Sequence, residues 1–481
     1  MSFSAVRSPA RYSPDIRRLR ERVPGVNYDA HCISRDGPSA TRAARWTTLK
    51  QAYGSRHMYD IAEFSLWSDE KQDFRRPEHL EMQWILQAYQ AVDVLLIWPE
   101  IHIITETAPN PLPLTVGCVA ARFLPANWVE KSDFSRVNTS YANPRLPNPV
   151  SFILPRWTSP NDEQKRSILL GLLNLANVKA VTWLGPSCYV ELHTGDDRTY
   201  GRHSLPGMVG GKRTTYHHSD VDLWVNDMGD LARARAIDPG AVTTGPRLQD
   251  RTNYLEVGAG VLQPGVRLAG SLNLRSGQFA NVEQSTSAGV RLRKNRGKVV
   301  MTAANHGFLE TDEVYHPSVL HGSKVGDIVE RWLAQDIAMV QLIPSVGVKN
   351  EEYFEATAPR RLLRASEAAT GGWCSVDGMS TGLVFLQRTG ERAVQIHLQE
   401  AAPGIANHTV EYEGEMLFST FGPNGGAAAA GVCGAPIVEE DDPEQEWFGG
   451  GGVCGFYRQG NAFMAITPAL DDLINSGWEI F

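Results

Sequence analysis

The sequence predicts a multidomain protein in which a mixed α+β amino-terminal region precedes an all-β region that ends in a helix. Up to about residue 250, helical patterns alternate with strand-like runs. From Tyr254 onward, short strands and turns follow one another at intervals of roughly 8–12 residues, a spacing typical of a barrel or sandwich. The length of 481 residues exceeds one ordinary core, since domains run to roughly 100–200 residues. We therefore expect an accessory domain with an amino-terminal arm at 1–250 and an all-β domain at 251–481.

Composition argues against several kinds of partner. A hydrophobic share of 42% is that of a globular protein, and a net charge of −8 with a pI near 5.9 argues against a nucleic acid or an anionic membrane as main partner. No stretch approaches the roughly 20 apolar residues of a membrane span. The arginine-rich amino terminus lacks the apolar core of a secretory signal, and the cysteines show no disulfide-framework spacing. We expect a reducing location, cytoplasmic or nuclear.

The first elements follow a polar arm with one short helix at Asp15–Val23. Between Glu78 and Val92 the apolar residues recur at helical spacing, which predicts an amphipathic helix. Two strand-like runs come after it, at Glu100–Thr107 and Pro113–Phe123.

A second pass of the same kind follows a proline- and asparagine-rich loop. Ser159 is a candidate cap for a helix whose apolar residues share one face. The two passes are open to interpretation as a degenerate α-β-β repeat, although no residue-level similarity joins them. The expected elements of the second pass are Val150–Leu154 as a strand, Asp162–Ala176 as the helix, and Val178–Leu184 and Cys188–Leu192 as strands.

One cluster in this region suggests metal chemistry. His217 and His218 are adjacent and lie close to aspartates, a combination that can bind zinc. Neighbours in a strand point to opposite faces, so both rarely ligate one ion. We therefore favour a hydrogen-bonding loop and expect no metal and no cofactor. A short helix at Asp227–Ala236 and a linker at Pro239–Pro246 complete the region.

Three polar residues of the all-β region lie where apolar strands begin or end. A hairpin over 288–304 leads to His306, and Asp336 begins the next apolar strand. Cys433 lies in the turn Gly-Val-Cys-Gly-Ala-Pro, where glycines let the backbone bend sharply and display the sulfur and nearby N–H groups. The chain closes with a helical pattern at Pro468–Ser476.

Histidine, then aspartate, then a nucleophile in a Gly-x-Cys-Gly-x-Pro turn resembles the chymotrypsin-like protease family, with cysteine where serine is usual. The resemblance covers roughly residues 255–481 and implies a double β-barrel with a terminal helix. It implies that Cys433 attacks a scissile carbonyl, that His306 activates it and that Asp336 fixes the tautomer of His306. The amides of Gly431 and Cys433 would form the oxyanion hole. The expected activity is cleavage of a peptide or protein substrate.

The resemblance also implies a substrate pocket. Its floor would lie at Ala427 to Ala430, where no acid pairs with a basic side chain, so we expect neutral or apolar specificity. One wall would be the strand after the nucleophile turn, with Val453, Cys454 and Gly455.

Several alternatives stay open. Gly-Val-Cys-Gly occurs twice, so Cys454 is a rival nucleophile, although only the first copy is followed by a proline and an apolar strand. Asp312 and Asp327 compete with Asp336 for the orienting role. Val432 replaces the aspartate that pairs with a newly cut amino terminus in secreted relatives, so we do not expect activation by that salt bridge. A barrel without activity would act as a pseudoprotease that binds peptides or proteins.

Overall fold

The computed structural model describes residues 54–125, 159–193, 205–218, 261–308, 311–399, 409–421, 431–440 and 450–481, with short gaps inside some of these ranges. Over these residues the chain is mostly β-strand with few helices. No helix among them is both long and apolar enough to cross a membrane. Four expected elements lie outside the described residues, namely Asp15–Val23, Val150–Leu154, Asp227–Ala236 and the linker at Pro239–Pro246.

The chain forms two compact units. One comprises Met1–Val129, Asp227–Gln387 and Ser419–Phe481, and the other comprises Glu130–Asn226 and Arg388–Phe418. Each unit is therefore built from segments that are distant in the sequence. The division at residue 250 and the α+β character of the amino-terminal region stay predictions, because these units draw on both halves of the chain.

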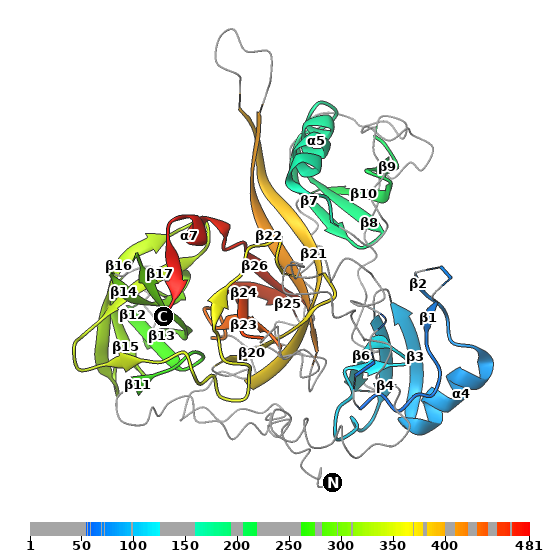
Figure 1. Cartoon of the computed structure of the whole chain (residues 1–481), viewed down its shortest axis with the longest axis horizontal. Helices are drawn as coiled ribbons and strands as arrows, with labels where there is room; N and C mark the ends of the chain where they lie inside the picture. Colours follow the sequence, from blue (N-terminus) through cyan, green and yellow to red (C-terminus); the bar gives the residue numbers. More distant parts are fainter. Residues whose placement is uncertain are drawn as a thin grey trace, which may run out of the picture. The chain divides into compact units, whose positions relative to one another are not determined.

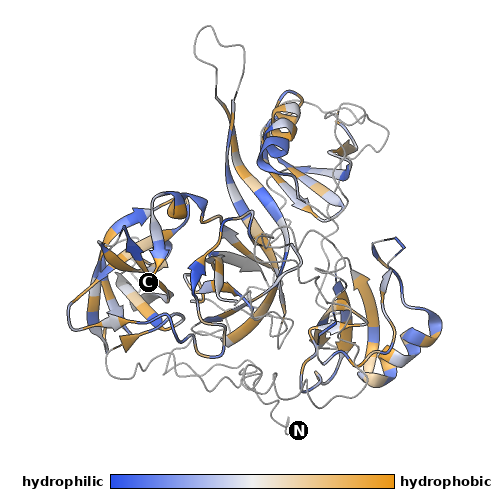
Figure 2. Cartoon of the chain, in the orientation of Figure 1, coloured by the Kyte–Doolittle hydropathy of each residue, from blue (hydrophilic) through white to orange (hydrophobic). Residues whose placement is uncertain are grey.

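The first unit begins with a module of one helix and a four-stranded sheet (Figure 1). The strand order is β3-β4-β6-β5, with β4 and β6 parallel. The helix and sheet share one apolar core, and β3 is coloured largely apolar in Figure 2. The elements are β1 (Trp67–Ser68), β2 (Asp73–Phe74), α4 (His79–Ala88), β3 (Ala91–Ile97), β4 (Glu100–Thr105), β5 (Thr115–Val116) and β6 (Val119–Pro125).

Two boundaries in this module differ from the prediction. The predicted helix Glu78–Val92 is too long, because Gln90 has a positive φ of 48° and the chain turns directly into β3. The run Pro113–Phe123 is not one strand but two strands of a hairpin, β5 and β6. They are joined by Gly117 and Cys118, whose φ angles are 58° and 65°.

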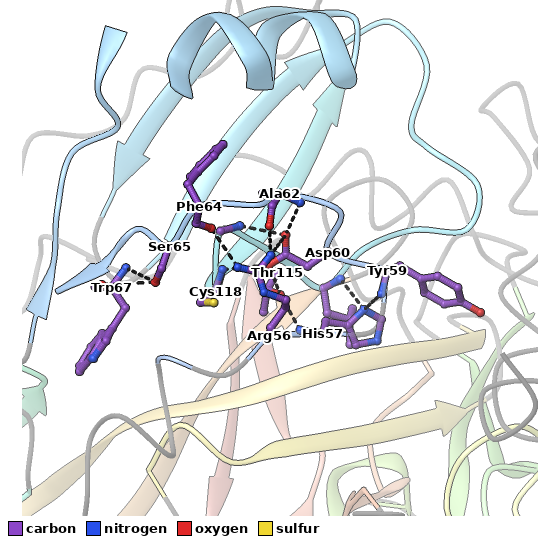
Figure 3. Close-up of polar contacts among 12 residues, drawn as sticks. Arg56, His57, Tyr59, Asp60, Ala62, Phe64, Ser65, Trp67, Thr115 and Cys118 are labelled. Atoms are coloured by element: carbon purple, nitrogen blue, oxygen red, sulfur yellow. Dashed lines mark hydrogen bonds and ion pairs between the residues drawn. The ribbon is translucent and has the colours of Figure 1, made fainter. Parts of the chain in front are cut away.

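A buried carboxylate holds that hairpin turn (Figure 3). The side chain of Asp60 accepts hydrogen bonds from the amides of Gly117 (3.0 Å) and Cys118 (2.8 Å). It also accepts one from the hydroxyl of Thr115 (2.9 Å), and Arg56 lies 3.7 Å away. Successive amides that converge on an anion stabilise a turn of this kind. Both oxygens of Asp60 are thus occupied by the module's own loop.

The second unit contains a helix and four strands. Apolar residues on one side of the helix are buried, and the helix carries both apolar and polar residues in Figure 2. Its cap is Asn161 rather than Ser159, because Asn161 and Gln164 bond to each other's backbone amides in a capping box. The elements are α5 (Asp162–Leu173), β7 (Val178–Leu184), β8 (Ser187–Leu192), β9 (Met208–Val209) and β10 (Lys212–His218). The long strand β21 (Gly382–Gln399) adds its residues 390–394 to the free edge of β7.

The two modules share one topology. In each, the first and second strands are antiparallel, the second and fourth are parallel, and the third and fourth form a hairpin. Each hairpin carries Leu-Pro-x-x-Val-Gly, beginning at Leu112 in one module and at Leu205 in the other. Both hairpins turn over two residues of positive φ, Gly117 and Cys118 or Gly210 and Gly211. The repeat that the sequence indicated as α-β-β is therefore a repeat of one helix and four strands.

Six strands of the first unit close into a barrel. Their order β12-β15-β16-β17-β14-β13 returns to β12 through an additional pairing, so the ring has no open edge. Apolar side chains fill its interior. The predicted hairpin over 288–304 is the end of β13 followed by β14. The strands are β12 (Arg267–Leu274), β13 (Asn281–Lys294), β14 (Val299–Ala304), β15 (Glu313–His316), β16 (Ser323–Trp332) and β17 (Ile337–Leu342).

A second group of six strands follows, in the order β24-β23-β20-β21-β22-β26. Its two ends approach closely, since a Cβ on Gly455 of β24 would lie 2.1 Å from Oγ1 of Thr467 on β26. One apolar cluster contains residues of both strand groups, so they share a seam. The remaining strands are β20 (Trp373–Gly378), β22 (Thr409–Phe421), β23 (Pro436–Glu439), β24 (Gly452–Phe456) and β26 (Met464–Pro468), with short strands β11 (Val261–Leu262), β18 (Gly347–Val348), β19 (Arg361–Leu362) and β25 (Gln459–Asn461).

The carboxyl terminus forms a short helix and then a strand. The predicted helix Pro468–Ser476 begins later, as α7 (Asp471–Asn475), because Pro468 still belongs to β26. A strand that the sequence analysis did not predict, β27 (Trp478–Ile480), then pairs with β13. The helix and strand pack into the apolar cluster at the seam.

Candidate active site

Strand register brings His306 and Asp336 together. β14 and β17 are antiparallel, and Ala304 at the end of β14 is paired with Ile337 at the start of β17. His306 follows β14 in the single turn η4 (Asn305–Phe308), and Asp336 immediately precedes β17. Two residues that are 30 positions apart in the sequence therefore lie at one edge of the closed barrel.

Asp336 contacts His306 through both carboxylate oxygens. Oδ2 lies 2.5 Å from Nδ1 of the ring, and Oδ1 accepts the backbone amide of His306 at 2.9 Å. The Asp336 carbonyl accepts the amide of Asn305, and Asp336 itself has a φ of 56°. The carboxylate is 10% exposed and the imidazole 47% exposed. The ring is thus fixed on its Nδ1 side by a nearly buried anion.

The competing carboxylates have partners elsewhere. Asp312 pairs with Arg331 at 2.7 Å, and Asp327 pairs with Lys324 at 2.7 Å. Arg331 also donates to the side-chain oxygen of Asn305 at 2.6 Å. Arg331 therefore stabilises the turn that carries His306. Of the three aspartates, Asp336 is the one whose carboxylate is hydrogen-bonded to the His306 ring.

Cys433 lies in a turn between two glycines with positive φ, Gly431 at 99° and Gly434 at 90°. Its half-buried thiol donates to the carbonyl of Arg458 at 3.1 Å. A hydrogen bond from the turn to the residue after β24, from the Gly434 amide to the Tyr457 carbonyl at 2.8 Å, ties the turn to that strand. Among the described residues, neither the Gly431 amide nor the Cys433 amide donates to a backbone carbonyl.

The imidazole interacts with both the carboxylate and the thiol. Hydrogen bonding to Asp336 is the largest cause, and hydrogen bonding to Cys433 the next, of a rise in the pKa of His306 to about 10. Burial opposes this rise. Because Nδ1 is used by Asp336, Nε2 is the ring nitrogen left for the sulfur.

The strand expected to form one wall of the substrate pocket is buried in the core of the protein. Val453, Cys454 and Gly455 lie in β24 and are buried, and the sulfur of Cys454 is 3.7 Å from that of Cys374. The residues that reach the nucleophile turn come just after β24 and include Arg458. Ala427 lies outside the described residues.

Sequence reasoning also missed the part that β13 takes in the site. The carbonyl of Cys433 accepts the amide of Ser287 at 2.9 Å and the hydroxyl of Thr286, and the hydroxyl of Ser287 donates to the carbonyl of Gly431 at 2.8 Å. No pattern around these two residues distinguishes them from other polar strand positions. Only the folded register reveals the contact.

The histidine pair does not assemble a metal site within the described part of the chain. His217 is buried in β10. No three histidine, cysteine, aspartate or glutamate residues among those described are grouped so that they could hold an ion.

Neither a family model nor a curated relative matches the chain. Similar solved structures include a glutamic-acid-specific serine protease, with 14% identity over 46% of this chain and 100% of the other and a TM-score of 0.28. Thermobifida fusca protease A matches with 14% identity over 46% of this chain and 98% of the other and a TM-score of 0.29. Cellulomonas bogoriensis chymotrypsin matches with 13% identity over 46% of this chain and 98% of the other and a TM-score of 0.28. At such low TM-scores the similarity carries no argument, so the assignment depends on the geometry of the site.

Proposed function

We propose that this chain is a cysteine endopeptidase with a chymotrypsin-like double β-barrel, in which Cys433, His306 and Asp336 form a triad. The position of His306 is the observation that carries the proposal. Its Nδ1 lies 2.5 Å from Asp336, and interaction with the sulfur of Cys433 adds to the rise in the pKa of the ring. One imidazole between a carboxylate and a thiol is the arrangement that nucleophilic acyl transfer needs.

In this mechanism Cys433 gives its thiol proton to Nε2 of His306, and the resulting thiolate attacks the scissile carbonyl carbon and forms a C–S bond. The carbonyl oxygen takes up the electron pair and is stabilised by the amides of Gly431 and Cys433. When the intermediate collapses, the C–N bond breaks and Nε2 of His306 gives its proton to the leaving amine. Water then attacks the thioester while His306 takes a proton, which releases the acid and restores the thiolate. Asp336 stays ionised and holds the ring.

The raised pKa of His306 fits its role as the acid that protonates the leaving amine. With a pKa of about 10 the ring carries its proton at neutral pH. The proton that the leaving amine requires is therefore already present beside the sulfur when the substrate binds. Neutral or apolar specificity stays a proposal, because Ala427 lies outside the described residues.

A peptide-library cleavage assay with the full chain tests this function. Wild type should cleave, and Cys433→Ala should lose activity by several orders of magnitude because the covalent step is removed. Cys454→Ala is the matched control, since it removes the cysteine of the other Gly-Val-Cys-Gly sequence, and it should cleave like wild type. Equal cleavage by wild type and Cys433→Ala would rule the mechanism out.

Alkylation by iodoacetamide distinguishes the enzyme from a silent peptide-binding protein. Mass mapping at neutral pH should find Cys433 modified first, and His306→Ala should remove that preference. Uniform, slow modification of all cysteines together with no cleavage would favour the pseudoprotease.

A further inference from the structure

The nucleophile turn is held by β13, a strand of the closed barrel. Ser287 donates its hydroxyl to the carbonyl of Gly431 at 2.8 Å and its amide to the carbonyl of Cys433 at 2.9 Å. The hydroxyl of Thr286 donates to the same Cys433 carbonyl. Both β13 residues are fully buried. Two carbonyls of the turn, two residues apart, are thus bonded to adjacent residues of one strand.

These bonds determine how the intervening amide points. Each peptide unit is planar, so a fixed carbonyl fixes its whole plane. Ser287 fixes the plane that follows Gly431, and the bonds to the Cys433 carbonyl fix the plane that follows Cys433. The peptide between them carries the amide of Cys433. Because the flanking planes hold the Cα atoms of Val432 and Cys433, this peptide is left with one motion, a flip about the line that joins those two atoms.

Packing around Ser287 leaves its hydroxyl little freedom. A Cβ added to Gly378 on β20 would lie 3.0 Å from the Ser287 hydroxyl, 3.0 Å from a methyl of Val432 and 3.1 Å from the Cβ of Ala435. Val432 is 2% exposed. The turn therefore has an apolar contact with β20 on one side and hydrogen bonds to β13 on the other, and no charged side chain takes part in these contacts.

We propose that Ser287 is a positioning residue that holds the nucleophile turn, and with it the Cys433 amide, in the orientation that stabilises an oxyanion, with Thr286 in a supporting role. The inference rests on the proposed function, since it concerns the acyl-transfer step of the same site. In this inference the closed barrel supplies the Ser287 hydroxyl, which keeps the nucleophile turn in the conformation needed for catalysis.

Ser287→Ala in the full chain is the decisive variant. It removes the hydroxyl bond to Gly431 and leaves the amide bond to Cys433 in place. We expect kcat for peptide cleavage to fall roughly tenfold, less than the 10²–10³-fold loss that follows removal of an oxyanion donor, with KM unchanged. The rate of Cys433 alkylation by iodoacetamide should stay the same, because displacement of iodide forms no oxyanion.

Ser375→Ala is the matched control. Ser375 is a fully buried serine on β20 whose hydroxyl has no hydrogen-bond partner among the described residues. Its removal should leave kcat, KM and alkylation unchanged. Thr286→Val, which keeps the branched shape and removes the hydroxyl, should lower kcat by less than Ser287→Ala, because the Ser287 amide still holds the Cys433 carbonyl.

Amide hydrogen exchange of 432–435 separates this inference from the proposed function. Exchange there should be faster in Ser287→Ala than in wild type and Ser375→Ala. If wild type cleaves no peptide, the proposed function fails. Faster exchange in Ser287→Ala would still support the inference that Ser287 holds the nucleophile turn. Unchanged kcat and exchange in Ser287→Ala would overturn the inference, and so would parallel losses of kcat and alkylation, which indicate general loosening.

Discussion

The same four residues, Gly-Val-Cys-Gly, occur at Gly431–Gly434 and at Gly452–Gly455 and fold differently. The first copy is a turn with a half-buried thiol that donates to the carbonyl of Arg458 and helps to raise the pKa of His306. The second is a fully buried stretch of β24 whose sulfur lies against that of Cys374. Local sequence alone therefore does not decide which cysteine is displayed. The environment that each copy meets in the fold decides it.

The glycines of the two copies serve different purposes. Gly431 and Gly434 have positive φ, which the turn requires. Gly452 and Gly455 lie in a strand where neighbouring atoms leave no room for a side chain. A Cβ at Gly455 would lie 2.1 Å from a side-chain oxygen of Thr467. The first pair permits a bend and the second permits contact between strands.

The largest expected effect is that of a change at Asp336, which should alter the reactivity of Cys433 and leave that of Cys454 unchanged. Asp336→Asn should lower kcat by about 10⁴-fold, because the amide no longer holds the tautomer of His306. Asparagine tolerates the positive φ at this position, so the turn should persist. Peptide cleavage and alkylation of Cys433 are measured, and alkylation of Cys454 should not change. Asp327→Asn is the control and should keep its activity. If Asp327→Asn loses activity and Asp336→Asn does not, then Asp327 orients His306 and the assignment of Asp336 is wrong.

The titration of His306 comes next. NMR of the ring should show a midpoint near pH 10 in wild type, because hydrogen bonds to Asp336 and Cys433 raise the pKa of His306 to about 10. A raised folded-state pKa contributes stability that is fully present below the unfolded value of about 6.5 and is lost as pH rises through about 10. Urea unfolding should therefore show wild type losing stability over this range. Asp336→Asn should lower the midpoint of the His306 titration and reduce the loss of stability at high pH. An unchanged midpoint would contradict the pairing of His306 with Asp336.

A smaller effect tests the two kinds of glycine. Gly455→Ala should destabilise by about 1–3 kcal/mol through overpacking, and Thr467→Ala in the same chain should relieve part of this loss, because it removes Oγ1 and Cγ2 but leaves the Cβ 2.8 Å away. Gly434→Ala combines a positive φ of 90° with a Cβ only 2.5 Å from the Ser287 carbonyl, and no side-chain truncation should rescue it. Thermal unfolding and peptide cleavage measure both, and rescue of Gly434→Ala by Thr286→Ala would refute the distinction.

The smallest effect concerns the second cysteine itself. Cys454→Ala should cost about 1 kcal/mol of stability, as expected for a small buried side chain, and alkylation of Cys433 should keep its rate. The free energy of unfolding in urea and the alkylation rate are the two measurements. A fall in the alkylation rate would show that the two copies are coupled.

The sequence was informative where a polar residue interrupts an apolar run. His306 and Asp336 lie next to β14 and β17, and the register of these strands brings them together. The burial of Val453, Cys454 and Gly455 could not be predicted, because the sequence of β24 does not show that the strand is covered on both faces. The contacts of Thr286 and Ser287 could not be predicted because they join residues far apart in the sequence, 147 positions from Thr286 to Cys433 and 144 from Ser287 to Gly431.

The capping and turn chemistry shows the same limit. Ser159 and Asn161 are both good caps, and only the bond between Asn161 and Gln164 selects one. The end of α4 at Ala88, shortly before the positive φ of Gln90, has no proline or glycine to signal it. Short-range patterns predicted that a helix exists, and tertiary contacts set its length.

The pairing of β7 with β21 has a consequence for synthesis of the chain. Val181 pairs with Ala393, roughly 200 residues later, and at about 5–20 residues per second a ribosome needs roughly 10–40 s to deliver that partner. During this interval the outer edge of β7 offers unpaired backbone groups, which invite association with other nascent chains. The outer edge of β7 is therefore one place where the nascent chain should depend on chaperones.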